Sequence, residues 1–377
     1  NRLKGWEIMK LRKIITLLLI GIFIVISVGY GLGLNNILKN FANENKVDEH
    51  SLNKKDKTSN NTNINVALTM DDKIENNTVW CGTFQLIWND LKNDFAKQDI
   101  EFSPQLEVVK NLNKGQFNTS KISDNSYYKA QGIPTEELKA EIEKEIKDKF
   151  NETSNILDGF DFDGNPDKYL LYAMLKKEFK FNKQFEELKN GQFGAYENVK
   201  YFGTKENSSE ELREQIQVLY YNSRDEFAVK LLTKQNDEII IAKGIEKDTF
   251  NDTYKEIQDK QNSYDSEKEF LKTDTLKIPN IDFKTEKEFK ELENKPFEIS
   301  DGNSYIIEKA IQTIQFELDK TGGKIKSEAG MGITKTALIR EEPRDFSVDN
   351  TFTLFLKEND KDMPYFAAKI ENINQFQ

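Results

Sequence analysis

Residues 306–323 read IIEKAIQTIQFELDKTGG, and residues 352–356 read FTLFL. Both stretches alternate apolar and polar side chains in the way that predicts β-strands. A charged, glycine-dotted stretch runs between them, from Gly322 and Gly323 to Pro343. A connection of this length inside a compact domain usually has a function of its own. We therefore expect two strands joined by a long exposed loop.

The composition of the whole chain narrows the class of protein. With 377 residues, 37% of them hydrophobic and 11% aromatic, it can bury the core of one large or two ordinary domains. A formal net charge of -11 and a pI near 5.1 argue against nucleic acid as a partner, because phosphates require a basic face. The chain has 48 lysines and 6 arginines, a bias that carries no functional information by itself.

The chain contains one cysteine, Cys81, and one histidine, His50. An internal disulfide is impossible, and no metal cluster, catalytic triad or phosphate-binding loop can be assembled. We expect a protein that is not an enzyme and that needs no metal and no cofactor. The sequence WCGTFQ at residues 80–85 permits a thiol site with Gln85 as oxyanion donor and His50 as base. We favour a buried, inert cysteine in a helix.

The N-terminal part has the pattern of a membrane anchor. Residues 14–34 carry no charge and follow Lys10, Arg12 and Lys13, so they can cross a bilayer with the basic residues 1–13 in the cytoplasm. Residues 35–77 are polar and predict a disordered linker, and residues 78–377 a folded domain outside the cytoplasm. A cleaved signal segment and a secreted protein are the alternative.

The folded domain combines helices and strands, which predicts the α+β class. Thr135 precedes an amphipathic helix that ends by Asn151, and residues 169–175 form a near-continuous apolar run typical of a central strand buried on both faces. The other expected elements are helices at 79–95 and 252–263, a strand at 275–283 with an irregularity at Pro279, and a meander of strands at 216–220, 227–232 and 238–242.

Several of these segments resemble the serpin family in wording and in order. Residues 169–181 resemble its central strand, with Tyr172 in place of the usual asparagine. Residues 307–310 (IEKA) resemble its Ile-His-Lys-Ala strand, 317–323 its Glu-x-Gly-Thr hinge, and 345–370 its terminal strands. The resemblance covers residues 135–373 and suggests a divergent bacterial-type member with a shortened N-terminal region. It implies large mixed and antiparallel sheets with packed helices and an exposed reactive-centre-like loop.

The same resemblance implies how the loop works. In an inhibitory serpin a protease cleaves the loop, becomes acylated, and is trapped when the loop enters the main sheet as a new strand. After Gly322 the charged side chains fall at even numbers, so period-two alternation turns the hinge residues Gly323, Ile325, Ser327 and Ala329 inward. The scissile bond is expected within residues 334–340. The candidate cleavage-site residues are Lys335, Thr336 and Arg340.

Two functions follow from these expectations. The first is an extracytoplasmic, membrane-anchored monomer that inhibits a serine or cysteine protease as a suicide substrate through residues 322–345, with Lys335 or Arg340 suited to a trypsin-like enzyme. The second is a non-inhibitory binding protein with the same fold, in which the basic residues are ordinary solvated loop charges.

Overall fold

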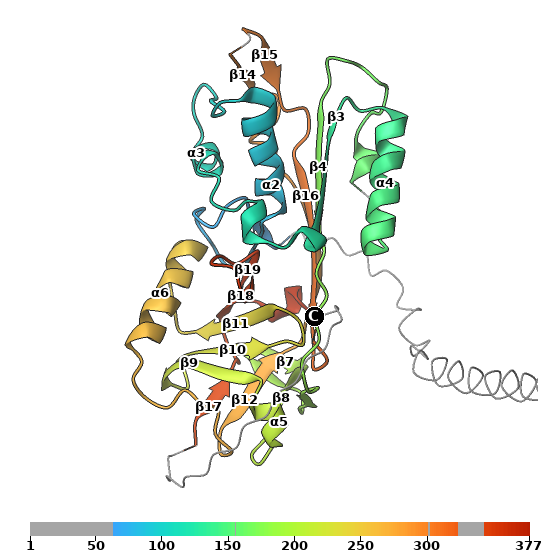
Figure 1. The fold of residues 1–377 in the computed structure, drawn as a ribbon. Coiled ribbons are helices and arrows are strands. Elements are labelled where there is room, and N and C mark those ends of the chain that lie inside the picture. The colour runs from blue at the N-terminus through green and yellow to red at the C-terminus, as the bar shows by residue number, and fades with distance from the viewer. Residues whose placement is uncertain (1–62, 155, 301, 323–342) are drawn as a thin grey trace, which may run out of the picture. The chain divides into compact units, whose positions relative to one another are not determined.

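A computed structural model describes residues 63–154, 156–300, 302–322 and 343–377. The expected basic N-terminus, the apolar segment 14–34 and most of the expected linker lie outside these ranges. Within them, no helix is long and apolar enough to cross a membrane. The fold is α+β, with mixed and antiparallel sheets and helices packed on them, as the sequence predicts (Figure 1).

A seven-stranded sheet forms the centre of the folded unit (Figure 1). Its strand order is β1 (Asn65–Ala67), β2 (Thr78–Cys81), β19 (Phe366–Ile370), β18 (Phe352–Glu358), β11 (Asp237–Lys243), β10 (Glu226–Leu232) and β9 (Ile216–Ser223). Strands β9, β10 and β11 are the predicted meander, and β18 and β19 the predicted terminal strands. All residues of β18 are buried.

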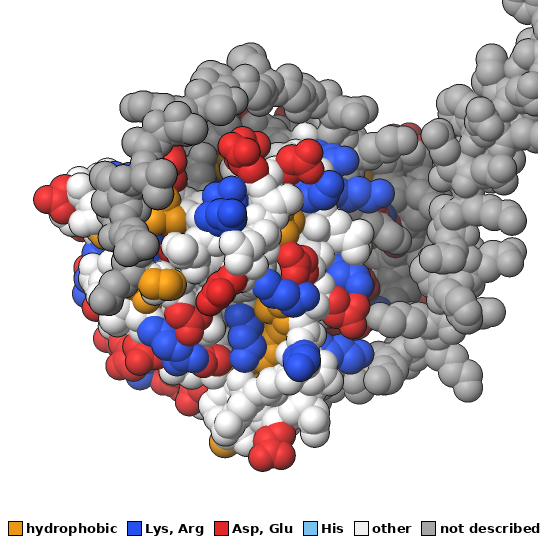
Figure 2. Space-filling model, turned by 90° about the horizontal axis from the view of Figure 1, so that it is seen from below, with side chains coloured by type: hydrophobic (Ala, Val, Ile, Leu, Met, Phe, Trp, Pro, Cys, Tyr) orange, Lys and Arg blue, Asp and Glu red, His pale blue; other side chains and the backbone are white. Residues whose placement is uncertain are grey.

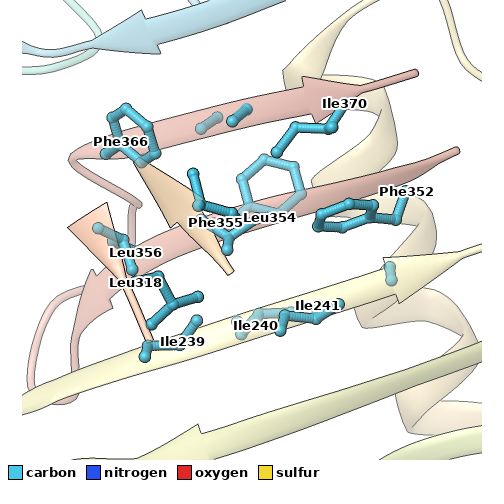
Figure 3. Close-up of a cluster of buried hydrophobic side chains, with 14 of the residues drawn as sticks. Ile239, Ile240, Ile241, Leu318, Phe352, Leu354, Phe355, Leu356, Phe366 and Ile370 are labelled. Atoms are coloured by element: carbon cyan, nitrogen blue, oxygen red, sulfur yellow. The ribbon is translucent and has the colours of Figure 1, made fainter. Parts of the chain in front are cut away.

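The main core lies on this sheet (Figure 3). Ile239 and Ile241 of β11 lie beside Leu354 and Leu356 of β18, and Leu318 from the end of another strand rests against them. All of these side chains are nearly inaccessible to solvent. Burying one leucine or isoleucine side chain contributes about 1.5–3 kcal/mol, so this cluster fixes that other strand onto the sheet.

The expected linker is too long at its C-terminal end. Four apolar residues that we assigned to it, Ile64, Leu68, Met70 and Ile74, are buried, and β1 pairs in parallel with β2. The compact unit begins near Asn60. Polar residues separate the four apolar ones, so the average composition of residues 63–77 resembles a linker although each apolar side chain enters the core.

The helices are α2 (Thr83–Asp90), α3 (Glu107–Asn113), α4 (Glu136–Phe150), α5 (Glu210–Arg213) and α6 (Phe250–Ser263). One π-helical segment follows α2 (Leu91–Ala96), and there are 3₁₀ turns at Thr119–Lys121, Asp124–Ser126, Leu157–Gly159 and Ile373–Gln375. The predicted helix at 79–95 begins only at Thr83, because the preceding residues belong to β2. Helix α4 is as predicted, since Thr135 caps it by accepting from the Leu138 amide and Asn151 ends it with a left-handed backbone.

A second, four-stranded sheet has the order β17 (Asp345–Ser347), β12 (Thr275–Pro279), β8 (Tyr201–Thr204) and β5 (Glu186–Glu187). Two hairpins complete the smaller sheets, β6 (Gly191–Phe193) with β7 (Tyr196–Val199) and β14 (Pro296–Glu298) with β15 (Ser304–Ile306). The strand predicted at 275–283 is therefore two strands in different sheets. It breaks after Pro279, and β13 (Ile281–Glu288) follows Asn280.

Two further strand pairs lie beside α2 and α4 (Figure 1): β3 (Tyr127–Gly132) with β4 (Leu170–Leu175), and β13 with β16 (Ile311–Leu318). The apolar run at 169–175 is packed on both faces as predicted, Leu171 toward the cluster around α2, and Leu170 and Tyr172 toward α4. Its predicted place inside a large sheet is wrong, because within the described residues β4 pairs with β3 alone.

Candidate functional site

The candidate site consists of the two ends of the segment 323–342. Of the predicted hinge residues the structure describes Gly322. The others, Gly323, Ile325, Ser327 and Ala329, and the cleavage-site candidates Lys335, Thr336 and Arg340 lie outside the described residues. What the structure gives is the set of residues to which both ends of this segment attach.

A tight turn follows β16 at the first end. The Asp319 carboxylate accepts from the Thr321 amide at 2.8 Å and from the Thr321 hydroxyl at 2.6 Å, and the Gly322 amide donates to the Asp319 carbonyl at 3.2 Å. An aspartate that bonds the backbone two residues on is a common way to reverse a chain. After this turn the chain runs back along the end of β16.

Gly322 itself bridges two segments. It forms antiparallel bridges with Asp319 on one side and with Lys180, in the segment that continues β4, on the other. Its φ is +115°, and an added Cβ would lie 2.5 Å from the Phe179 carbonyl oxygen and 2.6 Å from the Lys180 Cα. Glycine is therefore required both for the backbone angle and for the close approach.

The segment after β4 holds this end of the loop through backbone bonds. The Phe181 amide donates to the Thr321 carbonyl at 3.1 Å, and the Phe185 amide donates to the Lys320 carbonyl at 2.9 Å. The two phenylalanine rings pack edge to face at 4.6 Å and are buried. On the surface, the Lys320 ammonium lies 2.6 Å from the Glu187 carboxylate.

A buried ionic network ties the same segment to the seven-stranded sheet. The Lys177 ammonium lies 2.6 Å from Asp237 of β11 and 2.5 Å from Glu358 of β18, and all three side chains are almost fully buried. The Tyr365 hydroxyl donates to Asp237 at 3.0 Å. Burial raises the pKa of Asp237, whereas for Glu358 the bonds from Lys177 and Ser123 outweigh burial and lower the pKa. Such a network opposes displacement of Lys177.

The strands on either side of Gly322 have unused edges. Within the described ranges β4 pairs with β3 alone and β16 with β13 alone, although Gly322 joins the continuation of one to the end of the other. A strand edge without a partner presents backbone donors and acceptors that can pair with an added strand. The segment that leaves Gly322 therefore starts between two edges that can accept a strand.

The second end is held by a buried ion pair. The Arg344 guanidinium lies 2.6 Å from the Asp274 carboxylate and donates to the carbonyl oxygens of Glu267 at 2.6 Å and Glu269 at 2.5 Å. The side chains of Arg344 and Asp274 are 9% and 0% exposed. Burial lowers the pKa of Arg344, but Asp274 outweighs it and the net direction is upward. The pair fixes the chain just before β17.

A second network follows directly along the chain. Arg224 donates to Asp345 at 2.9 Å and pairs with Asp349, whose carboxylate also lies 2.8 Å from the buried Lys243 ammonium. Burial alone raises the pKa of Asp349, yet Lys243 and Arg224 together hold it below its ordinary value. Both networks join the start of β17 and the following turn to the body of the fold.

Sequence reasoning missed Arg344 and Arg224. The available signal was the scarcity of arginine, because a chain with 48 lysines uses 6 arginines, and two of these hold this end of the loop. Arginine presents a planar fork of donors that lysine cannot replace at a buried carboxylate.

The alternative thiol site has no support in the geometry. Cys81 is buried at the end of β2, in a strand and not in the helix we predicted, and its sulfur lies 3.2 Å from the Thr83 hydroxyl. Burial raises the pKa of the Cys81 thiol, which disfavours the nucleophilic thiolate. The Gln85 amide donates to Asn89 and to the Leu112 carbonyl, and His50 lies outside the described residues.

The surface around this end of the fold carries both signs of charge. Figure 2 shows lysine and arginine side chains interspersed with aspartate and glutamate, with few hydrophobic side chains between them. A mixed surface produces no strong single-sign field, so it selects no partner by charge alone.

No family model matches the chain, and no curated protein sequence matches it. The fold is similar to that of solved serpins. A crystal structure of Serpin48, a highly specific serpin of the insect Tenebrio molitor, is 12% identical over 79% of this chain and 92% of that chain, with a TM-score of 0.46. Human thyroxine-binding globulin complexed with thyroxine is 12% identical (TM-score 0.37; 63% of this chain, 64% of that chain). Maspin is 16% identical (TM-score 0.38; 62% and 65%).

Proposed function

We propose that this chain is a serpin-like protease inhibitor that acts as a suicide substrate through residues 322–345. The observation that carries the proposal is the pairing of Gly322 with both Asp319 and Lys180. A strand that continued from Gly322 in the same direction would run between the free edges of β4 and β16 and gain backbone hydrogen bonds on both sides. That gain, available only after cleavage releases the segment, would drive the trapping of the acylated protease.

The side-chain pattern after Gly322 is compatible with such a strand. The odd-numbered residues Gly323, Ile325, Ser327 and Ala329 are small or apolar and would face the interior, and the charged even-numbered residues would face solvent. Lys335 and Arg340 suit the acidic specificity pocket of a trypsin-like protease, and cleavage after Lys335 would leave Thr336 as the next residue.

The first experiment is incubation of the full chain with a panel of serine and cysteine proteases, followed by denaturing electrophoresis. We expect a covalent complex with a trypsin-like enzyme, lost in Lys335→Ala if that residue is the specificity residue and in Arg340→Ala if the other is. Cleavage without any stable complex across the panel would refute inhibition and favour the non-inhibitory binding protein.

A matched pair of variants tests the strand itself. Ser327→Glu places a carboxylate at a position that would be buried after insertion, whereas Lys326→Glu places one at a position that would face solvent. We expect Ser327→Glu to be cleaved as a plain substrate and Lys326→Glu to retain complex formation. In the parent protein, nicking of the loop should raise Tm, because the inserted strand adds hydrogen bonds. Equal behaviour of the two variants contradicts insertion.

We also propose that residues 14–34 anchor the protein in the cell membrane with residues 78–377 outside the cytoplasm. Support comes from the uncharged length of this segment and the basic residues before it. Flotation of the full chain with vesicles after alkaline washing tests the anchor. A protein recovered entirely in the soluble fraction would instead be secreted.

A further inference from the structure

The exposed large hydrophobic side chains of the described residues gather at one end of the fold. They are Ile133, Tyr169 and Ile306, which are 42%, 44% and 49% exposed. Gly132 pairs with Leu170, so Ile133 and Tyr169 directly follow and precede paired residues at the same end of the β3–β4 hairpin. Ile306 ends β15, which lies at the same end of the view as that hairpin (Figure 1).

Two partly buried aromatic rings make these side chains one continuous surface. The Phe95 ring lies 4.9 Å from the Tyr169 ring and 5.1 Å from the Tyr305 ring, and Tyr305 precedes Ile306. We call the set Ile133, Phe95, Tyr169, Tyr305 and Ile306 the apolar end. Exposed apolar side chains that adjoin one another are typical of a surface that contacts a partner, whereas scattered ones are ordinary.

The chain enters the folded unit in the same apolar cluster. Val66 and Leu68, at the start of the described residues, share the cluster that contains Phe95 and Tyr305. The preceding part of the chain contains the uncharged run at 14–34. The loop ends, in contrast, attach near β12 and β17, which lie at the other end of the folded unit (Figure 1).

The charges next to the apolar end are largely paired. Lys168 lies 3.2 Å from Asp163 and 3.5 Å from Asp161, the Lys309 ammonium donates to the Gly159 carbonyl at 3.2 Å, and Gln131 donates to Asp94. This balance offers no excess of positive charge for anionic lipid headgroups. Aliphatic and tyrosine side chains together are typical of protein surfaces at the boundary between headgroups and hydrocarbon.

From these observations we propose that the apolar end rests in the interface of the bilayer that holds the proposed anchor, with the apolar side chains inserted among neutral lipids. The proposal rests on the proposed membrane anchoring and not on protease inhibition. It keeps the ends of the loop directed away from the lipid surface, where a soluble protease has access to the loop.

Site-directed spin labelling of the full chain tests this contact. The protein is reconstituted in phosphatidylcholine nanodiscs with a label at Tyr169→Cys or Ile306→Cys, and with a control label at Glu197→Cys, an exposed site on β7. Cys81 is buried, and the unmodified chain gives its labelling background. We expect the ratio of oxygen to nickel-chelate accessibility to be severalfold higher at Tyr169 and Ile306 than at Glu197, and unchanged when phosphatidylglycerol is added.

Two results would overturn the proposal. If both patch labels are as accessible to the nickel chelate as the Glu197 label, the apolar end lies in water. If they are shielded from oxygen and nickel chelate alike, a protein surface, such as a second copy, covers it. Flotation in the same preparation separates these results from failure of the anchor, because an unanchored chain does not enter the nanodiscs at all.

Discussion

The two ends of the segment 323–342 are attached to the fold in different ways. At Gly322 the attachment consists of backbone hydrogen bonds and an aspartate turn near the surface. At Arg344 it is a desolvated ion pair with Asp274. Backbone groups at the first end can exchange one strand partner for another at small net cost, whereas opening the second end leaves a buried charge without its partner. The comparison identifies the Gly322 end as the one suited to move.

Removal of the buried pair at the second end should have the largest effect. Arg344→Met leaves the Asp274 carboxylate buried without its cation, so we expect the free energy of unfolding to fall by about 3–5 kcal/mol in denaturant titrations. The double variant with Asp274→Leu should recover much of this loss. Arg213→Met is a matched control, because Arg213 makes one bond to the Ser208 carbonyl. Equal losses in Arg344→Met and Arg213→Met would show that both ends are loosely held.

Substitution of the glycine at the first end should have the next largest effect. Gly322→Ala requires a side chain at a φ of +115° and places a Cβ against the backbone of the segment after β4. Gly302→Ala is the control, with a φ of +83° and no atom within 4 Å of the added Cβ. The strain at either position costs about 1–3 kcal/mol, and the close approach at Gly322 adds to it. Denaturant titrations that find Gly302→Ala as damaging as Gly322→Ala would contradict the tight joint.

Acid should weaken the second end through Asp349. Its folded-state pKa is lowered, so it stabilises the fold above its unfolded pKa of about 3.9, and this contribution is lost as the pH falls through the lower folded value. Asp349→Asn should therefore reduce stability at neutral pH and flatten the loss of stability between about pH 5 and the folded pKa. Thermal melts across this range measure it. An unchanged acid slope would remove Asp349 from the network.

The smallest effect is expected at the surface pair of the first end. Lys320 and Glu187 are 35% and 75% exposed, so Lys320→Ala should cost less than about 1 kcal/mol, and the cost should vanish in high salt. A loss comparable to that of Arg344→Met would mean that side chains, and not backbone bonds, hold the Gly322 end. Denaturant midpoints at two salt concentrations provide the measurement.

Local signals explain which parts of the fold could be predicted from the sequence. Thr135 and Asn151 define α4 because capping depends on neighbouring residues alone, and the meander β9–β11 follows from alternation and turn residues. Side-chain patterns report which faces of a strand are buried. They do not report which edges are paired, and for this reason the position of β4 was predicted wrongly while its burial was predicted correctly.

For the candidate site, the sequence indicated the hinge but not its fixed counterpart. Gly322 is visible as one of two adjacent glycines after an alternating strand. Arg344 lies among ordinary charged residues, and its partner Asp274 is far away in the sequence. Burial of such a pair depends on the arrangement of β12 and β17, which no local pattern contains.

The pairing of β2 with β19 also has a consequence for the order of folding. Thr78 to Cys81 pair with residues close to the C-terminal end of the chain, and β19 in turn pairs with β18. The central sheet therefore cannot close until nearly the whole polypeptide has been synthesised and, if exported, has crossed the membrane. Contacts so distant in sequence form slowly. Until then the edge of β2 and the apolar residues beside it stay open, so the nascent protein depends on being kept from aggregating before its last strand arrives.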